Sequence, residues 1–239
     1  MRLFNQGRAL VIGIAAYPPP NTLPSTVSKD ARDVADLLLA EAYCGYEAGH
    51  VELLVDDQAT GQRIREGLER LANESGPDDT VVFYFSGHGC RVQSGPEAGS
   101  YLIPHNCEPG RWRETAIESD ELTTFFKAVS AKKFVILIDA CHAGATGDLK
   151  SVPPSEDVEL GVDLKAYNKL IDGVGRIIMA SSRADEKSRI LPGMGNSLFT
   201  HYLLEALKGA AACPGEDIIR VFEVFRYISD QVPARSSQQ

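Results

Sequence analysis

Short apolar runs alternate along this chain with segments of helical periodicity, and this alternation is the feature that most limits the fold. The runs are rich in Val and Ile and are bounded by polar or glycine-containing segments. In order they are Ala9–Ile14, Val51–Val55, Thr80–Phe85, Phe134–Asp139 and Arg176–Ala180. Continuous apolar runs of this length are typical of strands that are buried on both faces of a parallel sheet. The sequence therefore predicts an α/β fold, with a mostly parallel central sheet and helices on both faces.

Apolar stripes between these runs predict the covering helices. One stripe is Val34, Leu37 and Leu38, and a second is Ile64, Leu68 and Leu71. A third helix is expected around Ser119–Val129, with Ser119 as its cap and Asp120 and Glu121 suited to its positive end. The strongest stripe is Phe199, Tyr202, Leu203, Ala206 and Leu207, and Gly209 closes it.

The remaining segments are assigned by composition. Ile218, Phe222 and Phe225 indicate one last helix before a polar tail. Gly87–Ser100, rich in Gly and Ser, and Ala143–Gly175, which contains two prolines and several acids, are expected to be irregular. A connection as long as the second segment is usually functional or disordered.

Composition excludes several classes of function. The net charge of −9 argues against nucleic acid as the main partner, because phosphate binding needs a basic surface. The five cysteines are scattered, without the spacing of a zinc site or of a secreted disulfide framework, so we expect a reducing cytoplasm. No stretch approaches the length of a membrane span, and the N-terminus has no secretory signal pattern.

Two reactive side chains follow two of the predicted strands directly. One strand runs into Ser86-Gly87-His88-Gly89, and another runs into Asp139-Ala140-Cys141-His142-Ala143-Gly144. The carboxyl ends of parallel strands are where open α/β sheets place their ligands. If the strands are neighbours, the His88 imidazole can manage the proton of the Cys141 thiol. A single buried cysteine or histidine is more often a packing residue, but the pair in this setting favours catalysis.

With these two turns the chain resembles the caspase-like cysteine peptidases of clan CD, peptidase family C14. Among them it is most similar to metacaspases and to the orthocaspase type of prokaryotic caspase homologue. Caspases place the catalytic His about 50 residues before the Cys motif, and here His88 precedes Cys141 by 53 residues. Similarity extends over Arg8–Tyr17, 29–31, Ala180–Ser188 and Ser197–Leu207. The resemblance implies a caspase-like three-layer sandwich.

The resemblance also implies acyl transfer. Cys141 attacks a peptide carbonyl, His88 protonates the departing amine, and water releases the acyl-enzyme. The backbone N–H groups of Cys141 and Gly89 are the expected donors to the oxyanion. His142 matches a variable position of the family and is taken as a neighbour. The other cysteines, Cys44, Cys90, Cys107 and Cys213, are taken as structural or incidental.

Specificity for a basic residue before the cleaved bond is implied by the acids at family pocket positions. Asp139 stands where aspartate-cutting caspases carry Gln, and Asp30 matches an acid of the first metacaspase loop. Ser86 and Asp185 match further wall positions. Carboxylates pair well with the fork of Arg and adequately with Lys. Local roles remain open for the two main acids, because Asp30 could serve a helix start and Asp139 a turn.

No cofactor is expected, and calcium-independent activity is predicted. Metacaspases that need calcium hold it with several acids, and here Asp148 and Asp120 match two of these positions while Ser119 replaces another. Calcium favours six to eight oxygen ligands, so two surviving acids make a poor site. Lys150, Lys165 and Lys169 are candidate sites of processing, although lysines in loops usually just face solvent.

The predicted organisation is one caspase-like catalytic domain over residues 1–239. Residues 8–148 correspond to a large-subunit-like part, 149–175 to a connecting loop and 176–232 to a small-subunit-like part. Relatives commonly continue beyond the position of Gln239, and the sequence leaves open whether this chain does too. A protein or peptide substrate is implied, and a regulatory partner protein is left open. Competing interpretations are a catalytically silent scaffold, an aspartate-specific peptidase, and a phosphatase or redox enzyme, although the chain has no matching Cys-loop-Arg or Cys-x-x-Cys motif.

Overall fold

One mixed sheet organises the protein. The computed structural model describes residues 6–141, 158–160, 175–180, 194–213, 215 and 218–236. The strands of this part are β1 (Gly7–Gly13), β2 (Val51–Val55), β3 (Thr80–Val92), β4 (Gly99–Leu102), β5 (Ile117–Glu118), β6 (Lys133–Cys141), β7 (Val158–Leu160) and β8 (Arg176–Ala180). Strands β2, β1, β3, β6 and β8 lie side by side in that order and are parallel. The predicted parallel sheet is therefore confirmed.

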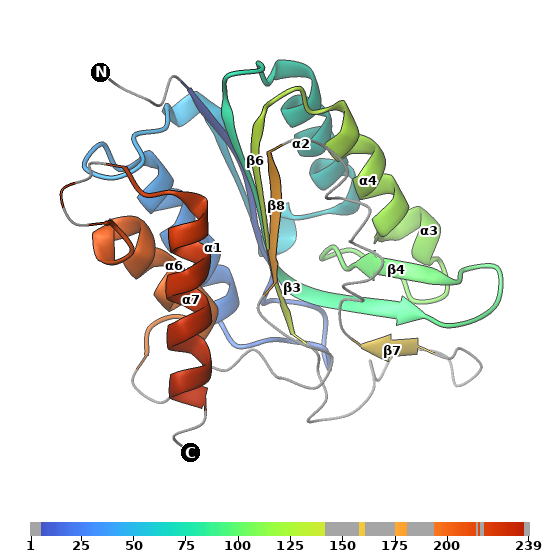
Figure 1. Cartoon of the computed structure of the whole chain (residues 1–239). Helices are drawn as coiled ribbons and strands as arrows, with labels where there is room; N and C mark the ends of the chain where they lie inside the picture. The colour runs from blue at the N-terminus through green and yellow to red at the C-terminus, as the bar shows by residue number, and fades with distance from the viewer. Residues whose placement is uncertain are drawn as a thin grey trace.

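The extension of β3 departs from the prediction. The segment Gly87–Ser100 was expected to be irregular, but β3 continues through it to Val92 and then pairs antiparallel with β4 and β7. Strand β7 itself lies inside Ala143–Gly175, which was also expected to be irregular. Glycine and serine weaken a strand, but antiparallel partners on both sides satisfy its backbone groups. Figure 1 shows the far end of β3 reaching past the parallel sheet toward β4 and β7.

Helices cover both faces of the parallel sheet (Figure 1). They are α1 (Thr26–Leu39), α2 (Gly61–Glu74), α3 (Trp112–Thr115), α4 (Ser119–Ala128), α6 (Leu198–Glu205) and α7 (Val221–Ser236). Helices α1, α6 and α7 lie on one face, and α2, α3 and α4 lie on the other. None of the described helices is both long and apolar enough to cross a membrane.

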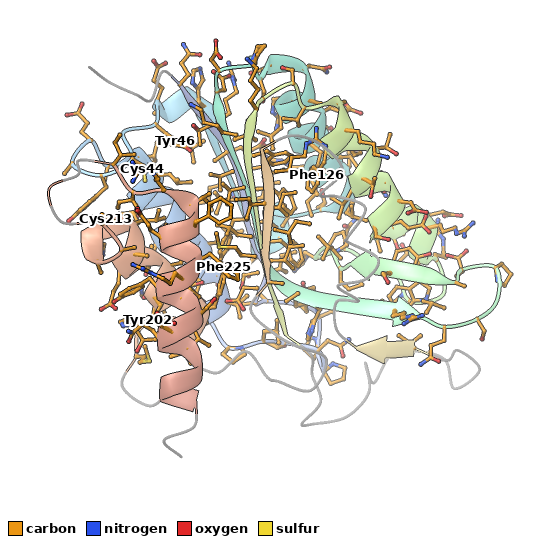
Figure 2. The ribbon with its side chains drawn as sticks, viewed as in Figure 1. Cys44, Tyr46, Phe126, Tyr202, Cys213 and Phe225 are labelled. Carbon is orange, nitrogen blue, oxygen red and sulfur yellow. The ribbon has the colours of Figure 1, made fainter. Side chains whose placement is uncertain are left out.

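Side-chain alternation along β3 divides the apolar core between these faces. Phe83 packs toward α4, where Phe126 stands edge-on to it at a ring-centroid distance of 5.0 Å and to Phe134 at 4.9 Å. Tyr84, the residue between, belongs to the core beneath α1 and α6. Figure 2 shows Phe126 on one side of the sheet and Tyr202 of α6 on the other. Successive residues of a strand point to opposite faces, so both cores are fixed by the same strand.

Two helix ends correct or confirm the sequence analysis. The expected cap at Ser119 is wrong, because Ser119 is already the first residue of α4 and the capping position, Glu118, makes no side-chain hydrogen bond. The extended Glu118, which pairs with β4, takes the capping position, so the helix starts one residue earlier than expected. Helix α6 itself ends at Glu205 and a π-helical turn, Ala206–Ala210, follows it; within that turn Gly209 adopts φ 116°, a conformation that favours glycine and breaks the helical path.

The face of the last helix is also corrected. Ile218 precedes α7, while Phe222 is 73% exposed and Phe225 is 51% exposed. Val224 and Ile228, one helical turn apart, are the buried residues that pack toward α6. The large aromatic side chains suggested the wrong stripe, because which side faces the core is set by where α6 lies. The helix also runs to Ser236, through the segment expected to be a polar tail.

Candidate active site

His88 and Cys141 are paired residues of neighbouring parallel strands. The register of β3 against β6 aligns Ser86 with Asp139, Gly87 with Ala140, and His88 with Cys141. Neighbouring strands lie about 4.8 Å apart, so the two backbones approach closely at the carboxyl edge of the sheet. The predicted pairing of His88 with Cys141 requires the two strands to be neighbours, and the structure confirms that they are. The side chain of Cys141 lies outside the described part of the structure.

A tyrosine from the end of β1 holds His88 in place. The backbone N–H of His88 donates to the Tyr17 hydroxyl at 3.0 Å, and that hydroxyl donates to the Ile103 carbonyl at 2.8 Å. The Tyr17 ring also contacts the imidazole, with ring centroids 4.6 Å apart. A Cβ at Gly87 would lie 2.7 Å from the Tyr17 hydroxyl oxygen. Glycine is therefore needed before His88 for Tyr17 to approach.

The two ring nitrogens of His88 have different surroundings. Nε2 lies 2.8 Å from the carbonyl oxygen of Asn21, which can only accept, so Nε2 carries the proton. Nδ1 is buried and has no hydrogen-bond partner among the residues that the structure describes. In the neutral ring, Nδ1 is then the nitrogen with a free lone pair. This tautomer leaves one nitrogen able to accept a proton.

Burial favours the neutral imidazole. His88 is 5% exposed, and desolvation lowers its pKa below the usual value, while the hydrogen bond to the Asn21 carbonyl acts in the opposite direction. A neutral imidazole is the form that can act as a general base near neutral pH.

A second cluster lies on the α1 and α6 side of the sheet. Asp30 of α1 and Asp139 of β6 are buried, and both bind Ser197, the residue that precedes α6. Asp30 accepts from the Ser197 backbone N–H at 3.1 Å and from Asn196 Nδ2 at 2.9 Å. Asp139 accepts from the Ser197 hydroxyl at 2.7 Å. We call Asp30, Asp139, Asn196 and Ser197 the acidic cluster.

Position at a helix start helps to keep these carboxylates buried. The N-terminus of a helix favours negative charge, and the Ser197 hydroxyl also accepts from the Thr200 N–H at 3.3 Å. Burial nevertheless raises the pKa of Asp30 to about 6; the hydrogen bonds to Asn196 and Ser197 lower it and the charge of Asp139 raises it. Asp30 is therefore ionised at neutral pH, although desolvation disfavours its charged form.

Ser86 and Tyr84 extend the acidic cluster toward the strand pair. The Tyr84 hydroxyl lies 2.8 Å from the Thr200 hydroxyl. Burial raises the pKa of Tyr84 well above its usual value, the charges of Asp139 and Asp30 raise it further, and hydrogen bonds with Thr200 and Ser86 oppose this. Three of the predicted pocket residues, Asp30, Ser86 and Asp139, thus come together from α1, β3 and β6.

Comparison with known proteins now assigns the family. A family model described as the caspase domain matches residues 6–239. The chain belongs to the caspase-domain family. Its relatives include metacaspase-1 of Candida albicans, 28% identical over 81% of this chain and 45% of that protein. Another is metacaspase-3 of Arabidopsis thaliana, 27% identical over 88% of this chain and 62% of that protein. The chain thus spans about half of the first relative and about three fifths of the second.

A solved structure supports the caspase-domain fold. The crystal structure of a structural-genomics target from Geobacter sulfurreducens superposes with a TM-score of 0.63 and covers 97% of this chain and 89% of that one. At 17% identity this likeness concerns the fold alone. The predicted three-layer α/β architecture is confirmed by it and by the sheet described above.

Several predicted residues of the caspase domain lie outside the described part of the chain. They are Asp148, Asp185, Lys150, Lys165 and Lys169. Asp120 is described, at the start of α4. The described ranges contain no group of three or more His, Cys, Asp or Glu side chains able to hold a metal ion. Because Asp148 lies outside those ranges, calcium-independent activity stays a prediction, and we derive no step through that ion.

The cysteines other than Cys141 lack the setting of a nucleophile. Burial raises the pKa of Cys44 to about 11 and that of Cys107, chiefly for the same reason, also to about 11. Cys90 is buried in the core, and the Cys213 thiol donates to Glu223 at 2.8 Å. A reactive cysteine needs a depressed thiol pKa, so Cys44 and Cys107 are unsuited to attack a carbonyl near neutral pH.

Four residues of this caspase domain were not assigned to the site from the sequence. Tyr17 and Asn21 orient His88, and Asn196 and Ser197 bind the acids. Ser197 stands before a strong apolar stripe, so it could have been recognised as a helix cap. Asn21 acts through its backbone carbonyl, which any residue carries, and no sequence signal marks it.

Proposed function

We propose that this chain is a cysteine endopeptidase that hydrolyses peptide bonds following Arg or Lys, with Cys141 as nucleophile and His88 as acid–base partner. The observation that carries the proposal is the register that pairs His88 with Cys141, together with the bare, buried Nδ1 of a neutral imidazole. A general base must lie within hydrogen-bond reach of the proton it takes.

The chemistry follows in two stages. The Cys141 thiol loses its proton to His88, the sulfur attacks the substrate carbonyl, and the imidazolium gives the proton to the leaving amine. Water, deprotonated by the same imidazole, then attacks the thioester and releases the acid. The backbone N–H groups of Cys141 and Gly89 are the proposed donors to the oxyanion, and the Asn21 carbonyl stabilises the imidazolium by accepting from Nε2.

The acidic cluster supports the preference for a basic residue. Asp139 precedes Cys141 by two residues on the same strand. The donors that Asp30 uses, Asn196 and Ser197, are neutral, so a substrate guanidinium would add an attractive charge. Ser86 would complete the pocket with its hydroxyl, and Asp185 is proposed as a further wall residue.

Matched peptides that differ only in the residue before the scissile bond test this function. Arg and Lys peptides should be cut, and the Asp peptide should be rejected by the acidic cluster. A labelled peptidyl electrophile carrying Arg should attach to Cys141, as located by mass spectrometry. Equal or better cleavage of the Asp peptide would refute the specificity, and failure of both peptides and label would indicate a silent scaffold.

A further inference from the structure

A cavity of about 190 Å³ borders His88, and none of the four residues of the acidic cluster is among its described lining residues. It is bounded by the segment after β1, by His88, and by the segment that follows β4. Most of its wall is apolar: Pro18, Pro19, Ile103, Pro104, Pro109 and Trp112. Sites for drug-sized ligands occupy about 300–1,000 Å³, so this cavity suits a single side chain. We call it the proline-lined pocket.

Two polar side chains that line the proline-lined pocket, His105 and Cys107, have protein partners. His105 Nε2 lies 2.9 Å from the Ala16 carbonyl oxygen, and the Cys107 sulfur lies 3.6 Å from the Thr115 hydroxyl. Burial raises the pKa of the Cys107 thiol to about 11, so this group is neutral. None of the described lining residues is an acid, Lys or Arg. A charged side chain entering here would lose water without gaining a partner of opposite charge among these residues.

The position of the pocket relative to the two halves of a substrate decides which half it contacts. The acyl half stays on Cys141 of β6, the strand that carries Asp139 of the acidic cluster. The amine half leaves with a proton from His88 of β3. Among the described lining residues, His88 is present and none comes from β6 or the acidic cluster. The pocket therefore lies beside the leaving half.

We infer that the proline-lined pocket binds the side chain of the residue immediately after the scissile bond and selects an apolar residue there. This inference rests on the proposed peptidase function but not on the preference for Arg or Lys. The occupant is neutral, of about the size of Leu or Met. Its burial beside His88 would hold the leaving nitrogen where the imidazole can protonate it.

The test uses peptides that share one acyl half, ending in whichever residue the enzyme prefers, followed by Leu, Met, Ala, Asp or Lys. One extra methylene in a hydrophobic pocket changes kcat/KM by roughly 10–200-fold. Leu and Met peptides should therefore exceed the Ala peptide by at least about tenfold, with Asp and Lys peptides below Ala. Equal rates for all five would overturn the inference while leaving the peptidase function intact.

Two variants test whether the proline-lined pocket causes the preference for Leu after the scissile bond. Cys107→Phe fills the pocket and should bring the ratio of Leu to Ala peptides close to one, whatever its effect on the overall rate. Glu108→Phe places the same ring on the next residue, whose side chain is exposed and paired with Arg111, and should keep the wild-type ratio. A Leu preference that survives Cys107→Phe would place the selecting surface elsewhere and refute the inference.

A partition experiment gives an independent measurement. The acyl-enzyme is formed from a peptidyl coumarin amide, which has no amino acid after the scissile bond, and leucinamide or alaninamide is added. The amine attacks the thioester, the carbon–sulfur bond breaks, and the thiol regains its proton. Leucinamide should capture the acyl group about tenfold better than alaninamide. Equal capture would contradict the inference, whereas failure to cleave any substrate would also refute the proposed function.

Discussion

The two regions that flank His88 differ in how they satisfy their polar groups. The acidic cluster keeps two buried carboxylates at a helix start, held by Ser197 and Asn196. Among the described residues that line the proline-lined pocket there is no Asp, Glu, Lys or Arg, and His105 is bonded to the backbone. Recognition of a charged side chain needs groups of opposite charge in the binding site. Recognition of an apolar side chain needs a wall whose polar groups are already hydrogen-bonded. The difference predicts a basic residue before the scissile bond of the substrate and an apolar residue after it.

Replacing Cys141 or His88, on which cleavage of every substrate depends, should have the largest effect on activity. Cys141→Ala should abolish peptide hydrolysis, and His88→Ala should lower kcat by at least about 10²–10⁴-fold, the usual contribution of general acid–base catalysis. Cys141 ends β6, and His88 lies where β3 passes the carboxyl edge of the parallel sheet, so circular dichroism should remain that of the native protein. Near-normal turnover in either variant would show that the nucleophile or base is elsewhere.

Removing one carboxylate should separate the regions. Charged hydrogen bonds contribute about 1.5–3 kcal/mol, so Asp30→Ala or Asp139→Ala should lower kcat/KM on Arg peptides by about tenfold to a hundredfold. Preference after the scissile bond should stay unchanged. Asp57→Ala, at an exposed position, is the matched control. Asp139 borders the nucleophile, so Asp30 gives the cleaner comparison; an unchanged rate for Asp30→Ala would remove it from the pocket.

Acidification should act on the charged region. The pKa of Asp30 is raised to about 6, so the carboxylate is ionised above that pH, and kcat/KM on Arg peptides should fall as pH drops below 6. Stability has the opposite sign: a raised folded pKa favours the protonated form, so the Asp30 contribution is lost as pH rises from about 4 to 6, by at most about 3 kcal/mol. Urea unfolding of wild type and Asp30→Asn at pH 4.5 and 7.5 measures this, and identical pH dependence would contradict it.

Removing the Ser197 hydroxyl should change both substrate preference and the stability of the fold. Ser197→Ala removes a helix cap and the donor to Asp139, so the free energy of unfolding should fall by about 1–2 kcal/mol and the preference for Arg over neutral residues should weaken. Thr60→Ala removes the cap of α2, far from the cluster, and should lower stability alone. Equal losses of Arg preference in both variants would make Ser197 a purely structural residue.

Chelation should have the smallest effect. Asp148 and Asp120 are the only matches to the calcium acids of the resembled family, so EDTA or EGTA should change kcat/KM by less than about twofold. Activity lost in chelator and restored by added calcium would show that the ion binds through residues not counted here.

The sequence by itself determined the five parallel strands, most of the covering helices, and the placement of His88 and Cys141 at the carboxyl edge of the parallel sheet. These follow from local chemistry: apolar runs make buried strands, and reactive residues after strands lie at one edge.

Only the tertiary structure decided how those residues are supported. The carbonyl of Asn21 selects the His88 tautomer, and Ser197 joins Asp30 to Asp139, which precede it by 167 and 58 residues. The tertiary structure also buries Val224 and Ile228 of α7 and leaves Phe222 exposed. Such choices depend on which segments meet in space, and backbone carbonyls and the direction of a helix face carry no local signal. That is why the sequence predicts the reactive pair but not the contacts that orient it.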